Sequence, residues 1–576
     1  MFFQMFFVWG YRGKGNKHNG VIIEEKGEVK RMRGAELMVR CLEEEGIKYI
    51  FGVPGEENIA FMDALLDSDI EFITTRQETG AAYMAGTMGR LTGKPGVSLS
   101  TLGPGATNMM TGVANSNMDL SPLIAITGQA DLERQHKESH QYYDLKAMYA
   151  PVTKWNASVL DPDIIPEIVK KAYYVATAEK PGATHIVLPE DIADMDVKAS
   201  PLKQTEHTLS EAGNTVIQKA AEQIKNAERP LIIAGNGVTR CGAADELKEL
   251  AEKLQVHVTH TFMGKGAIPF TNELSLLTSG LGGKDYINCG FEYADLIIAV
   301  GFDMVEYPPK NWNPDGETPV LHIDTKEADI DENYPVSLNV VGNIDTNLKR
   351  LTEAVEGRAE KDEHYAKLRQ DILDELEDYE NDEGYPLKPQ RIVSDLRDVL
   401  GEEDILLSDV GAHKMWISRM YHCYKPNTCL ISNGLASMGI ALPGAIGAKL
   451  AKPDRKVLAV AGDGSYLMNG EELETAVRLN LPIVVMIWRD NGYGLIGWHQ
   501  EKAYDRKSNV EFGNPDFVKL AEAYGATGYR IEEQEDLKPT LEKAFKSDGP
   551  VVIECPVDYR ENMKLTERLG KVICKN

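Results

Sequence analysis

The sequence predicts an α/β protein made of three doubly wound parallel-sheet domains. Short apolar runs of strand length alternate with helix-length segments along most of the chain, a pattern typical of parallel sheets with helical crossovers. The chain has 576 residues, which is too long for a single hydrophobic core. The alternation falls into three successive blocks of similar size, and no short repeat or low-complexity tract interrupts them.

The first block covers residues 31–197. Its predicted strands are residues 49–51, 72–74 and 97–100, and a helix is predicted over residues 78–91. Each of these strands is short and apolar and is followed by a turn or a helix, which favours a parallel sheet. Residues 198–207 show weak periodicity, and we interpret them as a linker.

The second block covers residues 208–355, with predicted strands at 230–234, 296–300 and 319–324. Gly235-Asn-Gly237 follows the first of these strands, but residue 240 is an arginine where a dinucleotide fingerprint has its third glycine. Residues 356–388 are dense in charge and helix-prone, so we expect a solvated connector there.

The third block covers residues 389–565 and is followed by a short tail, residues 566–576. Strands are predicted at residues 405–409, 457–461, 483–487 and 551–554. The same alternation of strand and helix predicts a third doubly wound domain.

Composition excludes several classes of function. The apolar fraction of 43% is that of a folded protein. The net charge of −27 argues against a nucleic-acid partner, because phosphate binding needs clustered Lys and Arg. The seven cysteines are scattered and form no CxxC pair, so we expect free thiols in a reducing compartment.

Residues 1–30 are expected to form a loose N-terminal extension, and Met32 is a possible alternative start. Residues 2–9 are apolar, but that run is far shorter than the roughly 20 residues that span a bilayer. Basic residues follow the run and no small-residue cleavage site appears, so a secretory signal is not expected. These features indicate a cytoplasmic protein with no membrane partner.

The strongest functional signal is Gly462-Asp-Gly-Ser465 together with Asp490-Asn-Gly492. Each segment directly follows a predicted strand, so Asp463 and Asp490 are expected at the same edge of a parallel sheet. Carboxylate and carbonyl oxygens suit Mg²⁺, and the amides of Gly464 and Ser465 could receive a diphosphate. A lone Gly-Asp-Gly is usually only a tight turn; the second segment favours a diphosphate site.

This pair of segments resembles the signature of the thiamine-diphosphate enzymes of the acetolactate synthase and pyruvate decarboxylase superfamily. The resemblance implies a pyrimidine-binding, a central and a diphosphate-binding domain, in that order. It also implies thiamine diphosphate and Mg²⁺ as cofactors, with Asp463, Asp490 and the carbonyl of Gly492 as metal ligands. Most members of the superfamily have Asn at the position of Asp490. An Asp at this position resembles the catabolic acetolactate synthases.

Two further regions carry the resemblance. Arg76–Ala85 is similar to the family's glutamate motif, and Glu78 matches the acid that hydrogen-bonds the aminopyrimidine ring. Taken alone, Glu78 could simply stabilise a helix N-terminus. Residues 432–443 and 408–413 resemble segments around the cofactor, with Met438 beneath its rings and Gly411, Ala412, His413 and Gly434 beside it. Met438 and His413 could equally be ordinary core residues.

Local matches favour the catabolic, flavin-free acetolactate synthases, so FAD is not expected. Residues 301–307 and 311–313 carry this likeness, and Gln141 matches a residue near the bound substrate. The implied reaction joins two pyruvate molecules into 2-acetolactate and CO₂ through an enamine on the cofactor. The resemblance also implies that Glu78 of one chain faces Asp463 of a partner, in a homodimer or homotetramer. The sequence gives no direct sign of a regulatory subunit.

One departure from the family leaves the substrate open. Glu56 and Glu57 stand where catabolic enzymes usually have a small residue and then Lys. An acid near the pocket would disfavour an anionic 2-oxo acid. The function therefore has two alternatives. One is another thiamine-diphosphate-dependent 2-oxo acid decarboxylase or carboligase, and the other is a flavin-dependent oxidase. A cofactor-binding scaffold without catalysis is disfavoured by the joint presence of Glu78, Asp463 and Asp490.

Overall fold

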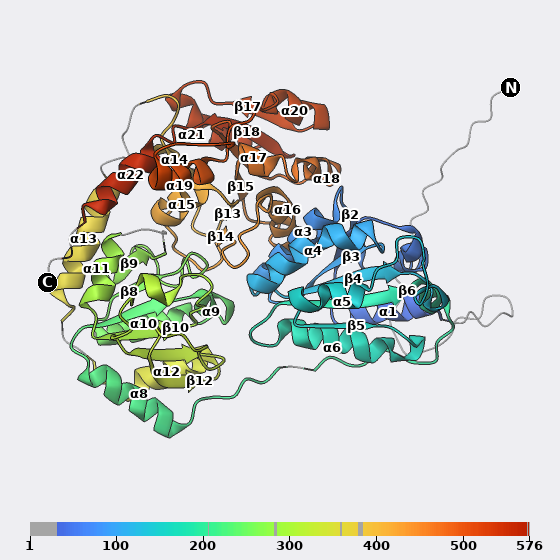
Figure 1. Ribbon diagram of the computed structural model, residues 1–576, viewed down its shortest axis with the longest axis horizontal. Helices are drawn as coiled ribbons and strands as arrows, with labels where there is room; N and C mark the ends of the chain where they lie inside the picture. The colour runs from blue at the N-terminus through green and yellow to red at the C-terminus, as the bar shows by residue number, and fades with distance from the viewer. Residues whose placement is uncertain are drawn as a thin grey trace.

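The computed structural model describes residues 32–205, 207–280, 285–357, 360–377, 384–572 and residue 574. The predicted extension of residues 1–30 lies outside the described residues. The described chain contains three parallel six-stranded sheets flanked by helices, so the predicted fold class is confirmed (Figure 1). No described helix has the length and apolar character needed to cross a membrane.

The first sheet has the strand order β2-β1-β3-β4-β6-β5. Its central strands β3 and β4 are buried on both faces, as expected for a parallel sheet covered by helices. The strands are β1 (Tyr49–Gly52), β2 (Glu71–Thr74), β3 (Gly96–Ser100), β4 (Leu123–Gln129), β5 (Trp155–Ser158) and β6 (Ala183–Pro189). The helices are α1 (Gly34–Glu44), α2 (Ile59–Leu65), α3 (Glu78–Thr92), α4 (Pro104–Met118), α5 (Leu145–Tyr149), α6 (Ile165–Thr177) and α7 (Glu190–Asp194).

The second sheet has the order β12-β11-β10-β7-β8-β9, with the first strand of the block, β7, next to the fourth, β10. Its strands are β7 (Pro230–Ala234), β8 (Val258–His260), β9 (Ser275–Thr278), β10 (Leu296–Val300), β11 (Val320–Asp324) and β12 (Val336–Val341). Its helices are α8 (Asn214–Asn226), α9 (Asn236–Arg240), α10 (Ala244–Leu254), α11 (Tyr286–Tyr293) and α12 (Ile344–Ala354).

The third sheet, β14-β13-β15-β16-β18-β17, repeats the permuted order of the first. Its strands are β13 (Ile405–Ser408), β14 (Cys429–Ile431), β15 (Val457–Gly462), β16 (Val484–Arg489), β17 (Thr527–Arg530) and β18 (Val551–Pro556). Its helices are α14 (Pro389–Val399), α15 (Ala412–Met420), α16 (Ala441–Ala451), α17 (Asp463–Tyr466), α18 (Leu473–Arg478), α19 (Gly494–Tyr504), α20 (Phe517–Tyr524), α21 (Leu537–Ala544) and α22 (Glu561–Gly570).

The first and third units share one hydrophobic core. Apolar residues of α3 and α16 belong to the same buried cluster, and the two helices lie side by side in Figure 1. Gly447 permits this close packing, because a Cβ there would stand 2.3 Å from the backbone oxygen of Met84. The strand-to-helix junction before α3 is therefore fixed directly against the third unit.

The expectation of a solvated connector is wrong for α13 (Glu363–Glu377). Tyr365, Leu368, Ile372 and Leu376 are buried in a core shared with the second and third units. These positions are spaced by three or four residues and therefore form one apolar stripe along the helix. The dense charges of the segment lie on its other faces, and they obscured this stripe in the sequence.

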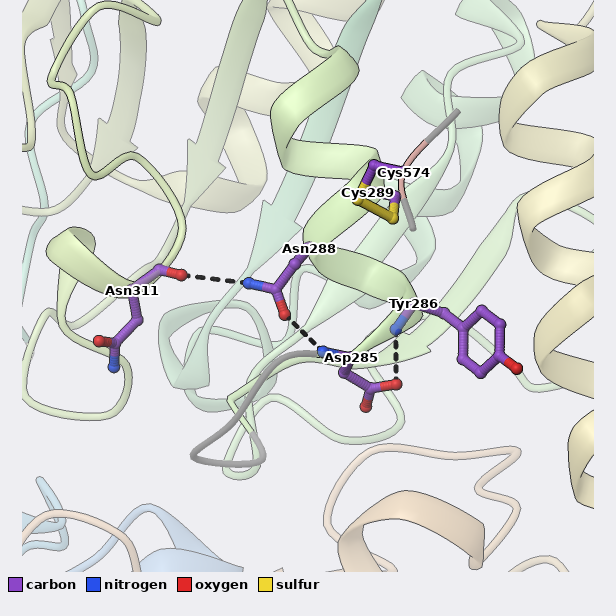
Figure 2. Close-up of a disulfide and its surroundings, with 6 residues drawn as sticks. All are labelled: Asp285, Tyr286, Asn288, Cys289, Asn311 and Cys574. Atoms are coloured by element: carbon purple, nitrogen blue, oxygen red, sulfur yellow. Dashed lines mark hydrogen bonds between the residues drawn. A yellow bond between two sulfur atoms is a disulfide. The ribbon is translucent and has the colours of Figure 1, made fainter. Parts of the chain in front are cut away.

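The expectation of free thiols is wrong for two of the seven cysteines. Cys289 on α11 forms a disulfide with Cys574, 285 residues away (Figure 2). Beside this bond the N-cap residue Asp285 and Asn288 form a capping box at the start of α11. The partners meet because α22, near the C-terminal end of the chain, is joined to α13 by the ion pair Arg568–Glu375, and α13 packs on α11. All three helices lie on the same side of the molecule in Figure 1. Cys41, Cys241, Cys423, Cys429 and Cys555 are free.

Candidate active site

Two carboxylates lie at the carboxyl ends of neighbouring strands of the third sheet. Asp463 follows β15 and Asp490 follows β16, and these strands pair in parallel. Oδ2 of Asp463 accepts the backbone N–H groups of Asn491 at 2.7 Å and Asp490 at 3.2 Å. The loop after β16 is therefore fastened to the residue that follows β15.

The side chain of Asn514 completes the support of Asp463. Its Nδ2 donates to Oδ2 of Asp463 at 2.8 Å and to Oδ1 of Asn491 at 3.0 Å. The other oxygen of Asp463 accepts the N–H of Gly464 at 2.8 Å. Both oxygens of Asp463 thus serve as acceptors, which requires a carboxylate at this position.

The two acids lie in an environment that disfavours negative charge. Burial and the neighbouring charge of Asp463 together raise the pKa of Asp490 to about 7. Burial also raises the pKa of Asp463, although four hydrogen bonds oppose the shift. A buried pair of like charges is stabilised by a cation, so the pair fits a divalent metal ion.

These acids border a cavity of about 250 Å³ at the carboxyl edge of the third sheet. Nine of the predicted site residues line it, so the fold brings them together. The lining is formed by Val410, Gly411, Ala412, His413, Ala436, Met438, Gly462, Asp463, Gly464, Ser465, Asp490, Gly492, Tyr493, Gly494, Leu495, Ile496 and Tyr559.

Met438 lies on the wall of this cavity and is only partly buried, so it is not an ordinary core methionine. Its segment is held by Asp409, which our sequence analysis did not single out. Oδ1 of Asp409 accepts the N–H of Gly439 at 2.8 Å, and Oδ2 accepts that of Ala441 at 2.9 Å. An acid directly after β13, at the same sheet edge as Asp463, is the signal that could have identified it.

His413 is both buried and part of the cavity wall. Burial lowers the pKa of His413 to about 3, so the ring is neutral. Its Nε2 makes no hydrogen bond to the described residues. Gly411 lies against this ring, since a Cβ at Gly411 would stand 2.8 Å from it. An unpaired ring nitrogen beside a bare glycine backbone fits a polar ligand.

Three predicted residues are not among the described residues that line this cavity. Gly434 packs against the end of α4: its N–H donates to Asp119 at 2.8 Å, and a Cβ would stand 2.3 Å from the oxygen of Met118. Glu78 and Gln141 belong to the first unit.

Glu78 is the first residue of α3 and is buried. Its Oε2 accepts a hydrogen bond from Nδ2 of Asn108 at 3.2 Å. The amides of Arg76 and Gln77, just before the helix, both donate to Oε1 of Glu472 at 3.0 Å. Glu472, another residue missed from the sequence, thus fixes the junction at which Glu78 begins α3.

Glu57, the unexpected acid, lies in the neighbourhood of Glu78. It is buried, and its carboxylate accepts a hydrogen bond from the hydroxyl of Thr101. A Cβ placed on Gly105 would stand 2.9 Å from Thr101 and 3.2 Å from Glu78. Gln141 has a left-handed backbone, and it contacts Gly103 in the same turn before α4. The first unit therefore gathers Glu57, Glu78 and Gln141 around the start of α4.

The donor set of the cavity fits Mg²⁺ and a diphosphate. Asp463 and Asp490 supply hard oxygen ligands, and the carbonyl of Gly492 lies in the same loop. Among the described residues no group of three or more His, Cys, Asp or Glu could hold a metal ion, so a metal here would use backbone and ligand oxygens as well. Gly464 would collide with Phe512 and Tyr493 if it carried a Cβ, and this leaves its backbone bare towards the cavity.

Comparison with known proteins identifies the family. Three models match in succession: the N-terminal TPP-binding domain of thiamine pyrophosphate enzymes at residues 32–148, their central domain at 217–351, and their C-terminal TPP-binding domain at 409–555. The chain is 38% identical over 562 residues to an acetolactate synthase of Bacillus subtilis, covering 95% of this chain and 97% of the relative.

Two further relatives agree. The catabolic acetolactate synthase of Raoultella terrigena is 36% identical over 549 residues, which cover 93% of this chain and 97% of the relative. A probable acetolactate synthase large subunit of Methanocaldococcus jannaschii is 37% identical over 563 residues, 94% of each chain. The chain therefore belongs to the acetolactate synthase family of thiamine pyrophosphate enzymes.

Proposed function

We propose that this protein is an acetolactate synthase that condenses two molecules of pyruvate into 2-acetolactate and CO₂. The observation that carries the proposal is the cavity that brings Asp463 and Asp490 together with Met438. The chain is also similar over nearly its full length to proteins named acetolactate synthase. When bound, thiamine diphosphate supplies the nucleophilic carbon and the electron acceptor that decarboxylation next to a carbonyl requires.

The metal and the diphosphate would be held by the third unit. Asp463, Asp490 and the carbonyl of Gly492 would hold Mg²⁺, whose positive charge would offset that of the diphosphate. The amides of Gly464 and Ser465 would donate to the diphosphate. Gly411, Ala412 and His413 belong to the same lining, and Nε2 of the neutral His413 ring has no hydrogen-bond partner among the described residues.

The organic part of the cofactor would be held between Met438 and Glu78. Met438 supports the rings, and its position is set by the hydrogen bonds of Asp409 to Gly439 and Ala441. The carboxylate of Glu78 would hydrogen-bond the aminopyrimidine ring and hold the proton there. Asn108 orients that carboxylate. Gln141 would lie beside the substrate.

The complete site would need a second copy of the chain. The cavity of about 250 Å³ is lined by residues of the third unit alone, and neither Glu78 nor Gln141 is among them. Leu435, Tyr493 and Ile496 on or near its rim are exposed apolar residues, which favours coverage by another protein surface. We propose that Glu78 of the partner subunit supplies that wall, in a homodimer or a homotetramer.

The test is product analysis with the purified protein, thiamine diphosphate, Mg²⁺ and pyruvate. We expect 2-acetolactate and CO₂ in equal amounts, without added flavin. Mg²⁺ removal by a chelator should abolish turnover and magnesium should restore it. Consumption of pyruvate with acetaldehyde as the sole organic product would reject the proposal and indicate a simple decarboxylase.

A second candidate function rests on Glu57. Its buried carboxylate accepts a hydrogen bond from Thr101 near Glu78 and would oppose the approach of a second anionic 2-oxo acid. A carboligase that joins the decarboxylated unit to a neutral aldehyde would avoid this repulsion. Competition between pyruvate and acetaldehyde as acceptors distinguishes the two functions: acetolactate synthase predicts mainly acetolactate, and the alternative predicts mainly acetoin.

A further inference from the structure

The disulfide between Cys289 and Cys574 fixes the end of α22 to the central unit. Cys289 lies on α11 and is 6% exposed, and Cys574 follows the last residue of α22 by four residues (Figure 2). Cys574 is only partly buried, so its sulfur is the one that a small thiol can approach. The position of α22 therefore depends in part on a bond that a thiol can break.

α22 contacts α19, a helix that begins at the cavity of Asp463 and Asp490. Gly494, the first residue of α19, lines that cavity. Four residues later, Nε1 of Trp498 donates a hydrogen bond to the hydroxyl of Thr566 on α22 at 2.9 Å. α22 thus holds the helix that directly follows the loop of Asp490.

α22 also contacts α15, whose first residues Ala412 and His413 belong to the cavity wall. Nε1 of Trp416 donates to Oδ1 of Asn562 at 2.8 Å, and both side chains are buried. A buried indole N–H needs such an acceptor, so this contact fixes α15 against α22. One helix therefore supports two of the elements that form the proposed cofactor site.

A network of ion pairs joins the same helices beside the disulfide. Arg419 of α15 binds Asp285, the N-cap residue of α11, and Glu375 of α13. Arg568 of α22 binds the same Glu375. Cys289 lies four residues after Asp285, about one helical turn away. Because a buried charge that loses a partner is costly, this network favours a single arrangement of the four helices.

From these contacts we propose that the Cys289–Cys574 disulfide is a redox-active site that controls the affinity of the protein for thiamine diphosphate. In the oxidised form the end of α22 is fastened, and α22 holds α15 and α19 in place around the cavity. Reduction releases this end and weakens cofactor binding. Asn562 and Thr566 are positioning residues in this scheme. The proposal rests on the proposed function and adds the regulation of its site.

The redox step needs a dithiol as reductant. One thiolate of the dithiol attacks the sulfur of Cys574, the S–S bond breaks, and Cys289 leaves as a thiolate that takes up a proton. The second thiol of the reductant then resolves the mixed disulfide on Cys574. Two electrons and two protons pass to the protein, and the reductant becomes a disulfide. A low-molecular-weight disulfide is the oxidant for the reverse reaction.

The first test measures the Kd of thiamine diphosphate by calorimetry with Mg²⁺ present, before and after reduction with dithiothreitol. We expect reduction to raise the Kd by at least about 5-fold, and reoxidation with glutathione disulfide to reverse the change. Cys574→Ser should bind as weakly as the reduced wild type and should not respond to dithiothreitol. Cys241→Ala, which removes a free thiol of the central unit, should respond like wild type.

Equal affinities of the oxidised and the reduced wild type would overturn this proposal and leave the proposed reaction in place. Absence of binding in both forms would instead reject the proposed cofactor site, and the redox control with it. The comparison of the two wild-type forms needs no variant, so it decides the matter even if Cys574→Ser does not fold.

The second test examines the contact between α22 and α19. Thr566→Val keeps the shape of the side chain but removes the hydroxyl that accepts the Trp498 N–H. The oxidised variant should bind thiamine diphosphate more weakly than oxidised wild type, and reduction should weaken its binding less, because both changes act through the same helix. Thr566→Ser keeps the hydroxyl and should restore both the affinity and the redox response. An undiminished redox response of Thr566→Val would contradict the role assigned to α22.

Discussion

At the scale of single residues, the site depends on carboxylates whose surroundings differ. Both oxygens of Asp463 accept hydrogen bonds, from Gly464 on one side and from Asn491 and Asn514 on the other. Among the described residues Asp490 has no comparable set of donors, and burial together with the nearby charge of Asp463 raises its pKa. The two acids should therefore tolerate the same substitution differently.

Asp463→Asn should weaken thiamine diphosphate binding far more than Asp490→Asn. An amide at residue 463 would place an NH₂ group against N–H donors, whereas an amide at residue 490 still offers one oxygen to the metal. We expect a loss of at least about 100-fold for Asp463→Asn and of less than about 10-fold for Asp490→Asn, measured by calorimetry with Mg²⁺ present. Equal losses would contradict the roles assigned to the two acids.

Glu78→Gln should separate binding from turnover. The amide keeps the size of the side chain but cannot hold the proton that the aminopyrimidine ring shares with a carboxylate. We expect kcat to fall by at least about 100-fold, with the Kd of thiamine diphosphate changed by less than about 3-fold. Glu71→Gln, on the exposed face of β2, is the matched control and should leave kcat unchanged. Full activity of Glu78→Gln would remove Glu78 from the mechanism.

Sequence motifs predicted the residues that stand at strand ends, and they missed the residues that support them. Asp463, Asp490 and Met438 belong to short segments with recognisable neighbours, and all three line one cavity. Asn514 and Glu472 bind partners that are far away in the sequence, and nothing in their own sequence segments indicates these contacts. Such pairings are set by tertiary packing, which a single sequence does not display.

At the scale of helices and strands, alternation of apolar runs predicted ten of the eighteen described strands. Most of these ten are buried on both faces and therefore form continuous apolar segments, whereas β2 is partly exposed. α13 was misjudged because its charges outnumber its apolar stripe of Tyr365, Leu368, Ile372 and Leu376. The buried Glu375 on this helix pairs with Arg419, so part of its charge also serves packing.

The junction before α3 should carry a pH dependence through Glu472. Burial raises the pKa of Glu472 to about 7, above the value of roughly 4.3 in an unfolded chain. The folded protein therefore holds this proton between about pH 4 and pH 7, and the charge costs stability as the pH rises through that range. Glu472→Gln removes this cost but retains an acceptor for the amides of Arg76 and Gln77.

We therefore expect the stability of Glu472→Gln relative to wild type to increase between pH 5 and pH 8, by up to an order of 3 kcal/mol. Urea unfolding at a series of pH values measures this difference. Glu474→Gln, on the same segment and partly exposed, should show no such trend. A difference between wild type and Glu472→Gln that stays constant over this range would show that Glu472 keeps its proton, or its charge, in both states.

At the scale of the whole molecule, the first and third sheets have the same strand order, and the central unit shares a hydrophobic core with the third unit. The first and third sheets share the permuted order and a common core through α3 and α16. The disulfide between Cys289 and Cys574 and the pair Arg568–Glu375 tie the C-terminal end to the rest. Their partners are far apart in the chain, which is why cysteine spacing alone predicted free thiols.

We propose that each active site combines Glu78 of one chain with Asp463 of its partner. It is tested most directly with mixed dimers of Glu78→Gln and Asp463→Asn chains, isolated through two different affinity tags. Each parent dimer should be inactive. The mixed dimer contains one intact site out of two, so it should regain about half of the wild-type rate of acetolactate formation per dimer. A mixed dimer as inactive as its parents would show that Glu78 and Asp463 do not act together across the two chains.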